Sequence, residues 1–303
     1  MILKSKAYAK INLYLDVTGI RDNGYHNIKS IMQTVDLHDE ITVESLDAAE
    51  ITEQIELTCS DPAVPTGEKN IAYKAALAFF REAGITSYSC RIHIGKHIPM
   101  EAGLAGGSTD AAAVLRLLNK LYDEPFDTDG LCRIGTRLGA DVPFCICGGT
   151  YLCEGIGEVL TPLPSMPDCH IVVARGGDGV STPAAYGLID EKWNRDFTKS
   201  GGDYDTLSAA LDRGDLCGMA DSMYNIFEDV ILPTHSVASR LKEIMTECGA
   251  VGAMMSGSGP SVFGIFESSK DAEKAADKAE EIARSFVCKP VGGTNNERQK
   301  NTN

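Results

Sequence analysis

Long apolar runs are missing from the 303-residue sequence. No stretch approaches the roughly 20 apolar residues that a membrane-spanning helix needs. The N-terminal segment from Met1 to Lys6 also has no extended apolar core of the kind that marks a signal peptide. We therefore expect a cytoplasmic protein with no membrane partner.

Basic residues are scarce relative to acidic ones. The chain has 28 Lys and Arg against 43 Asp and Glu, and its formal net charge is −15. A nucleic-acid backbone needs a basic surface, so this balance argues against a nucleic-acid partner. A small anionic ligand is still possible, because backbone N–H groups can bind an anion whatever the net charge.

The ten cysteines include no C-x-x-C pair, and Cys145 and Cys147 form a lone C-x-C inside an apolar run. Zinc sites usually draw on such pairs, and disulfide frameworks are typical of short secreted chains. We therefore expect reduced, mostly buried thiols, with neither a zinc site nor a disulfide framework.

Both alternating and helical apolar patterns occur along the chain, which predicts an α+β fold. Strict alternation over residues 6–17 predicts a half-buried strand. Further strands are expected over residues 28–35, 40–46, 51–59, 90–98, 150–153, 170–174, 251–255 and 262–266. Helices are expected over residues 70–83, 108–121, 128–138, 182–190, 205–210, 216–219, 237–248 and 271–286.

Three prolines, Pro162, Pro164 and Pro167, lie between two expected strands and mark the best domain boundary. We expect residues 1–161 to form an N-terminal domain and residues 162–291 a C-terminal domain. The polar segment 292–303 offers little to bury, so it is expected to be a disordered tail.

Residues 99–109 form a small-residue loop, P-M-E-A-G-L-A-G-G-S-T, between an expected strand and an expected helix. Glycines let the backbone approach a ligand closely, and the following helix start offers unpaired N–H groups and a positive dipole end. This combination predicts a site for a di- or triphosphate. The hydroxyl of Ser108 or Thr109 could cap the helix, or reach a phosphate or a bound Mg²⁺.

The loop is neither of the two common nucleotide motifs, because G-x-x-x-x-G-K-[ST] and G-x-G-x-x-G are both absent from the sequence. A tight strand-to-helix turn that simply needs small residues is the alternative interpretation. Two further glycine loops, Gly148-Gly149 and residues 255–261, favour backbone packed around a ligand instead.

Three other groups could carry chemistry. Lys10 shares a strand face with Asn12, although a solvated face of an edge strand is the alternative. Asp141 precedes an apolar segment, where a carboxylate is either a cap or a working acid or base. Tyr25 and His26 follow a glycine turn and could stack on a base or simply decorate a hairpin.

These motifs resemble those of the GHMP kinase superfamily. Residues 99–109 are similar to its second, phosphate-binding motif, and residues 253–263 resemble its third. Within the superfamily, the sequence most resembles the kinase family that acts on 4-diphosphocytidyl-2-C-methyl-D-erythritol in non-mevalonate isoprenoid synthesis. That resemblance runs in order from about Lys6 to Phe286, through residues 9–13, 24–26, 139–144, 148–150 and 225–228.

The resemblance implies a two-domain GHMP kinase fold of the α+β class. Its N-terminal half is like ribosomal protein S5 and binds the nucleotide, and its C-terminal half is a ferredoxin-like α/β domain. The implied reaction transfers the γ-phosphoryl group of ATP, with Mg²⁺, to the 2-hydroxyl of the methylerythritol group.

The same resemblance assigns roles to individual residues. Asp141 matches the catalytic aspartate that accepts the hydroxyl proton, and Lys10 matches its cationic partner. The implied ATP-binding residues are Pro99, Met100, Glu101, Ala102, Gly103, Leu104, Ala105, Gly106, Gly107, Ser108 and Thr109. The implied substrate-binding residues are Asn12, Tyr25, His26, Thr182 and Tyr186, of which Tyr25 and His26 receive the cytosine. Asn70 and Lys96 are placed near the adenine end.

Of three departures from the family pattern, at Glu101, Thr109 and Ile226, the first matters most, and two alternatives accompany this interpretation. Glu101 stands where the family often has a small residue, and we expect it to face solvent because a carboxylate repels phosphate. The chain could instead be a superfamily kinase of another alcohol, such as homoserine or mevalonate, or a non-catalytic ligand sensor. Tyr25 and His26 argue against the first alternative, and Lys10 with Asp141 against the second. A monomer or weak homodimer is expected.

Overall fold

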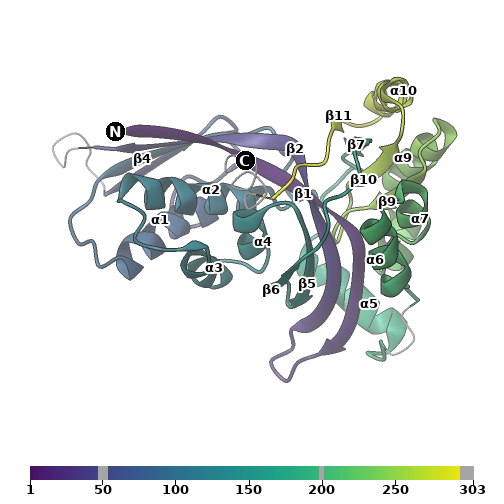
Figure 1. Cartoon of the computed structure of the whole chain (residues 1–303), viewed down its shortest axis with the longest axis horizontal. Helices are drawn as coiled ribbons and strands as arrows, with labels where there is room; N and C mark the ends of the chain where they lie inside the picture. The colour runs from purple at the N-terminus through teal and green to yellow at the C-terminus, as the bar shows by residue number, and fades with distance from the viewer. Residues whose placement is uncertain (47–53, 198–200, 294–303) are drawn as a thin grey trace. The chain divides into compact units, whose positions relative to one another are not determined.

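The computed structural model describes residues 1–46, 54–197 and 201–293 (Figure 1). The chain forms two compact units. Unit 1 comprises residues 1–9, 37–98 and 105–147, and unit 2 comprises residues 10–36, 99–104 and those from 148 onward. These units differ from the expected domains because the long strands β1 (Ile2–Ile20) and β2 (His26–Ser45) contribute to both. The domain boundary at residue 162 stays a prediction.

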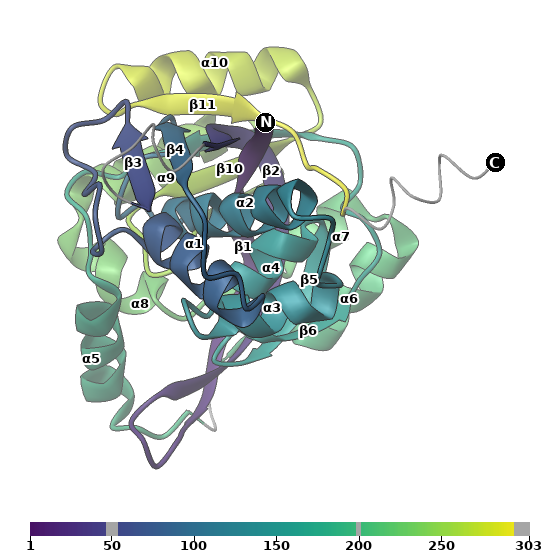
Figure 2. The same ribbon diagram turned by 90° about the vertical axis from the view of Figure 1, so that its left-hand side faces the viewer.

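Unit 1 is a sheet covered by helices. The C-terminal part of β2 pairs antiparallel with β4 (Cys90–Gly95), and β3 (Ile55–Cys59) pairs parallel with β4. Four helices lie on one face of these strands (Figures 1 and 2): α1 (Ile71–Glu82), α2 (Gly106–Leu121), α3 (Thr128–Thr136) and α4 (Val142–Cys147). Apolar residues that alternate along the strands, such as Ile41, Val43, Ile92 and Ile94, are fully buried.

Unit 2 contains a second, antiparallel sheet in the order β11-β7-β10-β9. Its strands are β7 (His170–Ala174), β9 (Gly252–Met255), β10 (Val262–Phe266) and β11 (Ser285–Cys288). Helices α9 (Ser236–Glu247) and α10 (Ser269–Glu280) bury their apolar stripes against this sheet in a shared core.

In the rest of unit 2, short strands pair with the C-terminal part of β1 and the N-terminal part of β2. The N-terminal part of β2 pairs with β5 (Thr150–Gly155), which pairs with β6 (Val159–Pro162), and β8 (Tyr224–Asn225) runs parallel to β1. The remaining helices are α5 (Thr182–Trp193), α6 (Tyr204–Arg213), α7 (Leu216–Asp221), α8 (Glu228–Ile231) and a 3₁₀ turn over Leu232–Thr234.

Two element predictions were wrong. The strands expected over residues 28–35 and 40–46 are one continuous strand, β2. The helix expected over residues 271–286 ends at Glu280, and β11 follows, because Ser285 to Cys288 pair with β7 and extend the sheet. Residues 51–53 of one expected strand, and residues 294–303 of the expected tail, lie outside the described residues.

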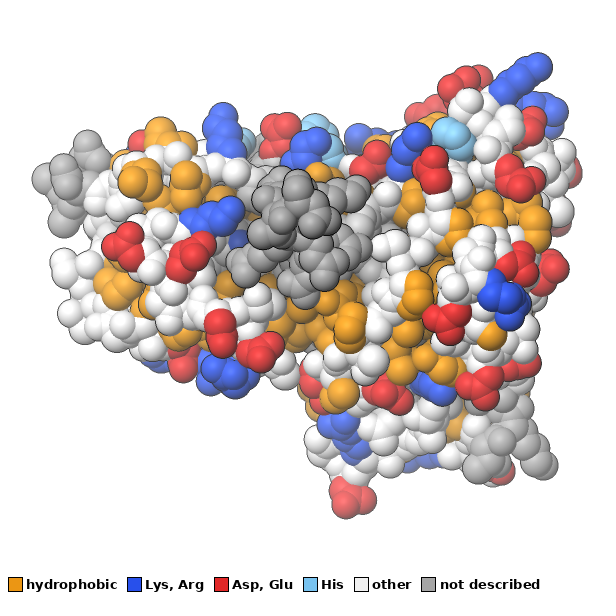
Figure 3. Space-filling view, viewed as in Figure 1, with side chains coloured by type: hydrophobic (Ala, Val, Ile, Leu, Met, Phe, Trp, Pro, Cys, Tyr) orange, Lys and Arg blue, Asp and Glu red, His pale blue; other side chains and the backbone are white. Residues whose placement is uncertain are grey.

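Among the helices of the described ranges, none is both long and apolar enough to cross a membrane. On the face drawn in Figure 3, acidic and basic side chains are interspersed. The ten cysteines all lie in the described ranges, none of them is in a disulfide, and six of them are buried.

Candidate functional site

The start of α2, in unit 1, forms the second half of the predicted phosphate loop. Ala105 precedes the helix in a left-handed conformation (φ 57°), and its side chain provides no cap for the helix start. Gly107 is exposed and Ser108 half-buried, so this end of α2 is accessible. Uncapped N–H groups at a helix start suit an anion.

The turn that carries Asp141 lies beside this helix start, within the same unit. A Cβ placed on Gly139 would lie 3.9 Å from Oγ of Ser108. Two residues later, the half-buried Asp141 opens α4, and its carbonyl oxygen accepts a 3.0 Å hydrogen bond from the N–H of Cys145. Unit 1 therefore places the turn that leads to the predicted catalytic aspartate next to the phosphate-loop helix.

A buried cation lies under the same helix start. The ammonium of Lys96 donates to Oδ2 of Asp39 at 2.6 Å and to Oδ2 of Asp110 at 2.8 Å. A Cβ on Gly106 would lie 3.1 Å from this ammonium. Oδ1 of Asp39 accepts the N–H groups of His97 and Ile98, so this ion cluster joins the end of β4 to the first turns of α2. Sequence analysis missed Asp39 and Asp110.

The ion cluster makes stability depend on pH. Burial raises the pKa of Asp110 from 3.8 to about 8, and Oδ1 of this carboxyl is buried without a hydrogen-bond partner in the described structure. Between these two pKa values the folded protein holds a proton that the unfolded chain has lost, so stability falls as pH rises. The slope from this one group reaches at most about 1.4 kcal/mol per pH unit.

We expect Asp110→Asn to remove this slope. Asparagine keeps the shape of a protonated aspartate, so the variant should lose little stability at pH 5 to 6 and be relatively more stable at pH 8. Urea unfolding at several pH values between 5 and 8 measures the effect. Every other titrating group is common to both proteins, so the difference between the two curves isolates Asp110. Parallel curves would contradict the assignment.

Lys10, in unit 2, is buried and fixed by hydrogen bonds. Its ammonium donates to Oδ1 of Asn12 at 2.6 Å, and Nδ2 of Asn12 donates to Oγ of Ser30 at 2.8 Å. Lys10 is 4% exposed and Asn12 is 1% exposed. The alternative of a solvated edge strand was wrong, because β1 lies between β2 and β8. Asn12 thus positions Lys10. The predicted contact between Asn12 and the substrate stays a prediction.

The two predicted glycine motifs meet beside Lys10. Oγ of Ser256 donates to the carbonyl of Gly103 at 3.0 Å, and a Cβ on Gly103 (φ +72°) would lie only 2.2 Å from the Ser256 carbonyl oxygen. A Cβ on Gly257 would lie 3.4 Å from the Lys10 ammonium. Only glycine at position 103 permits this approach of backbone to backbone.

Side-chain hydrogen bonds from Asn225 and Glu228 fix the backbone of the third motif. The side-chain amide of Asn225 donates to the carbonyls of Met255 and Gly257, at 2.7 and 2.9 Å. Oε1 of Glu228 accepts the N–H of Met255 at 2.8 Å. The sequence offered these residues only as part of a resemblance, and the structure gives them a physical role.

Three predicted substrate-binding residues lie on or near α5. His26 stacks on Tyr186, with ring centroids 4.4 Å apart and an interplanar angle of 26°. Nε2 of His26 lies 2.7 Å from Oδ1 of Asp190, a partner that sequence analysis missed. Thr182 begins α5, and its hydroxyl lies 3.2 Å from that of Ser258 in the third motif. Tyr25 is 60% exposed.

The remaining predicted residues differ in exposure. Ala102, Leu104 and Thr109 are buried, so only their backbone groups suit a ligand. Pro99 is half-buried, whereas Met100 and Glu101 are exposed, as expected for Glu101. Asn70 caps α1 by accepting the N–H of Ala72. Within the described ranges, no three His, Cys, Asp or Glu side chains gather as a metal site.

Comparison with known proteins gives this site its family. The GHMP kinases N terminal domain matches residues 70–149, and the GHMP kinases C terminal domain matches residues 207–284. A 4-diphosphocytidyl-2-C-methyl-D-erythritol kinase of Clostridium botulinum is 45% identical over 91% of this chain and 95% of its own length. The chain belongs to the GHMP kinase family. Such a kinase uses ATP as its cosubstrate.

Solved structures agree with this membership. The crystal structure of a 4-(cytidine 5'-diphospho)-2C-methyl-D-erythritol kinase matches this chain with a TM-score of 0.79 and 32% sequence identity. The match covers 96% of this chain and 100% of that one. The homoserine kinase of Cytophaga hutchinsonii has a TM-score of 0.72 at 20% identity, over 96% of this chain and 95% of its own. The second match shows the shared fold alone.

Proposed function

We propose that this GHMP kinase transfers the γ-phosphoryl group of ATP to the 2-hydroxyl of 4-diphosphocytidyl-2-C-methyl-D-erythritol. The supporting observation is the level of identity. Relatives named as kinases of this substrate, such as that of Caldicellulosiruptor saccharolyticus, reach 45% identity over 95% of the chain. A homoserine kinase and a mevalonate kinase of the same fold share only 20% and 16%.

Asp141 is the proposed general base. A tertiary alcohol is a weak nucleophile, and a carboxylate within hydrogen-bond reach can accept its proton as the bond to phosphorus forms. The turn at Gly139, two residues before Asp141, lies beside the start of α2, which supports this role. Lys10 is the proposed electrostatic partner of the reaction, because a cation stabilises the negative charge on the moving phosphoryl group.

The phosphates of ATP are the proposed ligands of residues 99–109. The glycine loop and the α2 start supply backbone N–H groups, and phosphoryl transfer depends mainly on such positioning and electrostatics. We propose Mg²⁺ as the accompanying ion, which would screen the phosphate charge. An ATP-bound Mg²⁺ needs only one or two protein ligands, and the half-buried Ser108 hydroxyl fits this use better than the buried Thr109.

The cytosine ring is the proposed ligand of Tyr25, His26 and Tyr186. Nε2 of His26 lies 2.7 Å from a carboxylate oxygen of Asp190, which can only accept, so we propose that Nε2 carries the proton in this contact. The other ring nitrogen, Nδ1, is the proposed acceptor for the amino group of cytosine. Asn12 and Thr182 are proposed neighbours of the rest of the substrate.

The setting follows from sequence and surface. We infer a cytoplasmic enzyme, a monomer or weak homodimer, without a nucleic-acid or membrane partner. The net charge of −15 supports the absence of a nucleic-acid partner, and the ten cysteines of the described residues, none of which is in a disulfide, support a reducing compartment.

An ATP-consumption assay tests the proposal. The purified protein is offered the cytidine substrate, homoserine or mevalonate with Mg²⁺ and ATP, and mass spectrometry identifies the product. We expect turnover with the cytidine substrate and a product that carries one additional phosphate on the methylerythritol group. Comparable kcat/KM for homoserine or mevalonate would overturn the proposal in favour of a sister kinase.

A further inference from the structure

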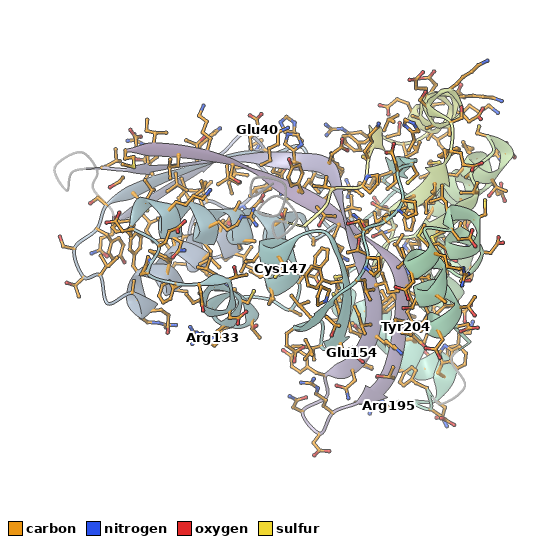
Figure 4. All side chains as sticks on the ribbon, in the orientation of Figure 1. Glu40, Arg133, Cys147, Glu154, Arg195 and Tyr204 are labelled. Carbon is orange, nitrogen blue, oxygen red and sulfur yellow. The ribbon has the colours of Figure 1, made fainter. Side chains whose placement is uncertain are left out.

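Two thiols of unit 1 lie close together next to the segment that carries Asp141. Sγ of Cys132, in α3, lies 3.8 Å from Sγ of Cys147, at the end of α4. Both residues are partly exposed. Figure 4 labels Cys147 at α4 and Arg133, the chain neighbour of Cys132, on α3. A disulfide needs a sulfur separation of about 2.05 Å, so closure requires only a small shift.

The packing of α3 on α4 explains why the thiols meet. A Cβ on Gly135 would lie 2.8 Å from Cγ1 of Val142 and 3.2 Å from Cδ1 of Ile146. The missing side chain at Gly135 therefore lets the two helices approach closely. Cys132 lies one helical turn before Gly135, so its thiol lies at the same interface between α3 and α4.

A buried cation lies beside the pair. The guanidinium of Arg116, from α2, donates to the carbonyls of Cys145 and Ile146 at 2.6 and 3.4 Å. It also interacts electrostatically with Cys147. A neighbouring cation favours the thiolate form, which is the nucleophile in thiol oxidation. A hydrogen bond with Cys147 and burial raise the pKa of Cys132. We therefore assign the attacking thiolate to Cys147, the thiol nearer to the cation, and the second step to Cys132.

We propose that Cys132 and Cys147 form a peroxide-reactive site that closes into a reversible disulfide and thereby slows phosphoryl transfer. Asp141 lies within the segment that the bond would close into a loop, at the start of the same short helix as Cys147. Drawing α4 towards α3 displaces this segment. Displacement of a reacting group by about 1 Å can cost up to about 10²-fold in rate.

The chemistry is balanced with hydrogen peroxide as the oxidant. The Cys147 thiolate attacks one peroxide oxygen, the O–O bond breaks, and hydroxide leaves and takes up a proton while Cys147 becomes a sulfenic acid. The Cys132 sulfur then attacks the Cys147 sulfur, the S–O bond breaks, and water leaves with the Cys132 proton. Two thiols lose two electrons, and peroxide becomes two waters.

Peptide mass spectrometry tests the bond without reference to activity. The reduced full-length protein is treated with hydrogen peroxide, its remaining thiols are alkylated, and it is digested without reductant. We expect one linked peptide pair joining Cys132 to Cys147, absent from Cys132→Ser and from Cys132→Ala. Cys145→Ser is the matched control, since Cys145 is the buried neighbour in the C-x-C, and it should keep the link. No link, or one to Cys145 instead, would overturn the site.

Kinase activity tests the consequence, which rests on the proposed function. Peroxide should lower kcat of the wild type by about tenfold or more, and dithiothreitol should restore it. Under the same treatment, Cys132→Ser cannot form the bond and should keep most of its kcat. A linked enzyme with unchanged kcat would overturn the regulatory role. An untreated enzyme without any turnover would refute the proposed function instead, and the two failures are therefore distinct.

Discussion

Asp141→Asn should lower kcat by about 10²-fold or more, with little change in ATP affinity. Asparagine has nearly the same shape as aspartate. The N–H of Cys145 donates to the backbone carbonyl of residue 141, which the substitution leaves in place, so the start of α4 should survive. The amide cannot accept a proton as a base. The hydroxyl would then attack without proton transfer to the protein, which removes an interaction made only in the transition state.

Steady-state kinetics and calorimetric ATP titration measure the two halves of this prediction. Asp123→Asn is a matched control in the same unit, because Asp123 is exposed in the turn after α2 and has no proposed role in the site. That variant should retain wild-type kcat. Near-normal turnover in Asp141→Asn would show that Asp141 caps α4 and that the base is elsewhere.

The strand and helix pattern was largely predictable because periodic burial is written locally into the sequence. Strict alternation identified β1, and the apolar stripe identified α2. Alternation did not show that β1 lies between two neighbouring strands, which is what buries Lys10 and Asn12. Strand β11 was missed because its register is set by pairing with β7, more than a hundred residues earlier.

The motifs of the site were predictable, whereas the partners that hold them were not. His26 pairs with Asp190 across a sequence separation of 164 residues, and Lys96 with Asp39 across 57. Neither carboxylate lies in a motif, so nothing local distinguishes it from the other acidic residues. The sequence identified Gly103 as one of the loop glycines. That no other residue fits there follows only from the backbone of Ser256, which lies against Gly103.

Cytosine recognition should make kcat/KM fall steeply when the base is changed. Uracil replaces the amino donor of cytosine by an acceptor and its ring acceptor by a donor. Nδ1 of His26 would then face an oxygen, and each buried polar group left unpaired costs about 1–3 kcal/mol. We therefore expect the uridine analogue to lose about tenfold to 10²-fold in kcat/KM. Free methylerythritol 4-phosphate should lose more, and in kcat as well, because binding energy from the nucleotide positions the hydroxyl.

Two variants divide this effect between stacking and hydrogen bonding. Tyr25→Ala should weaken the binding of the cytidine and uridine substrates equally, by about 1–3 kcal/mol, because stacking does not distinguish the two bases. Asp190→Asn leaves the volume unchanged but disturbs the tautomer of His26 through Nε2, so it should narrow the preference for cytosine over uracil. Measuring kcat/KM for the three substrates with each variant separates the two terms. Equal values for all three substrates in the wild type would mean that no cytosine pocket exists, and the chain would be a kinase of a different alcohol.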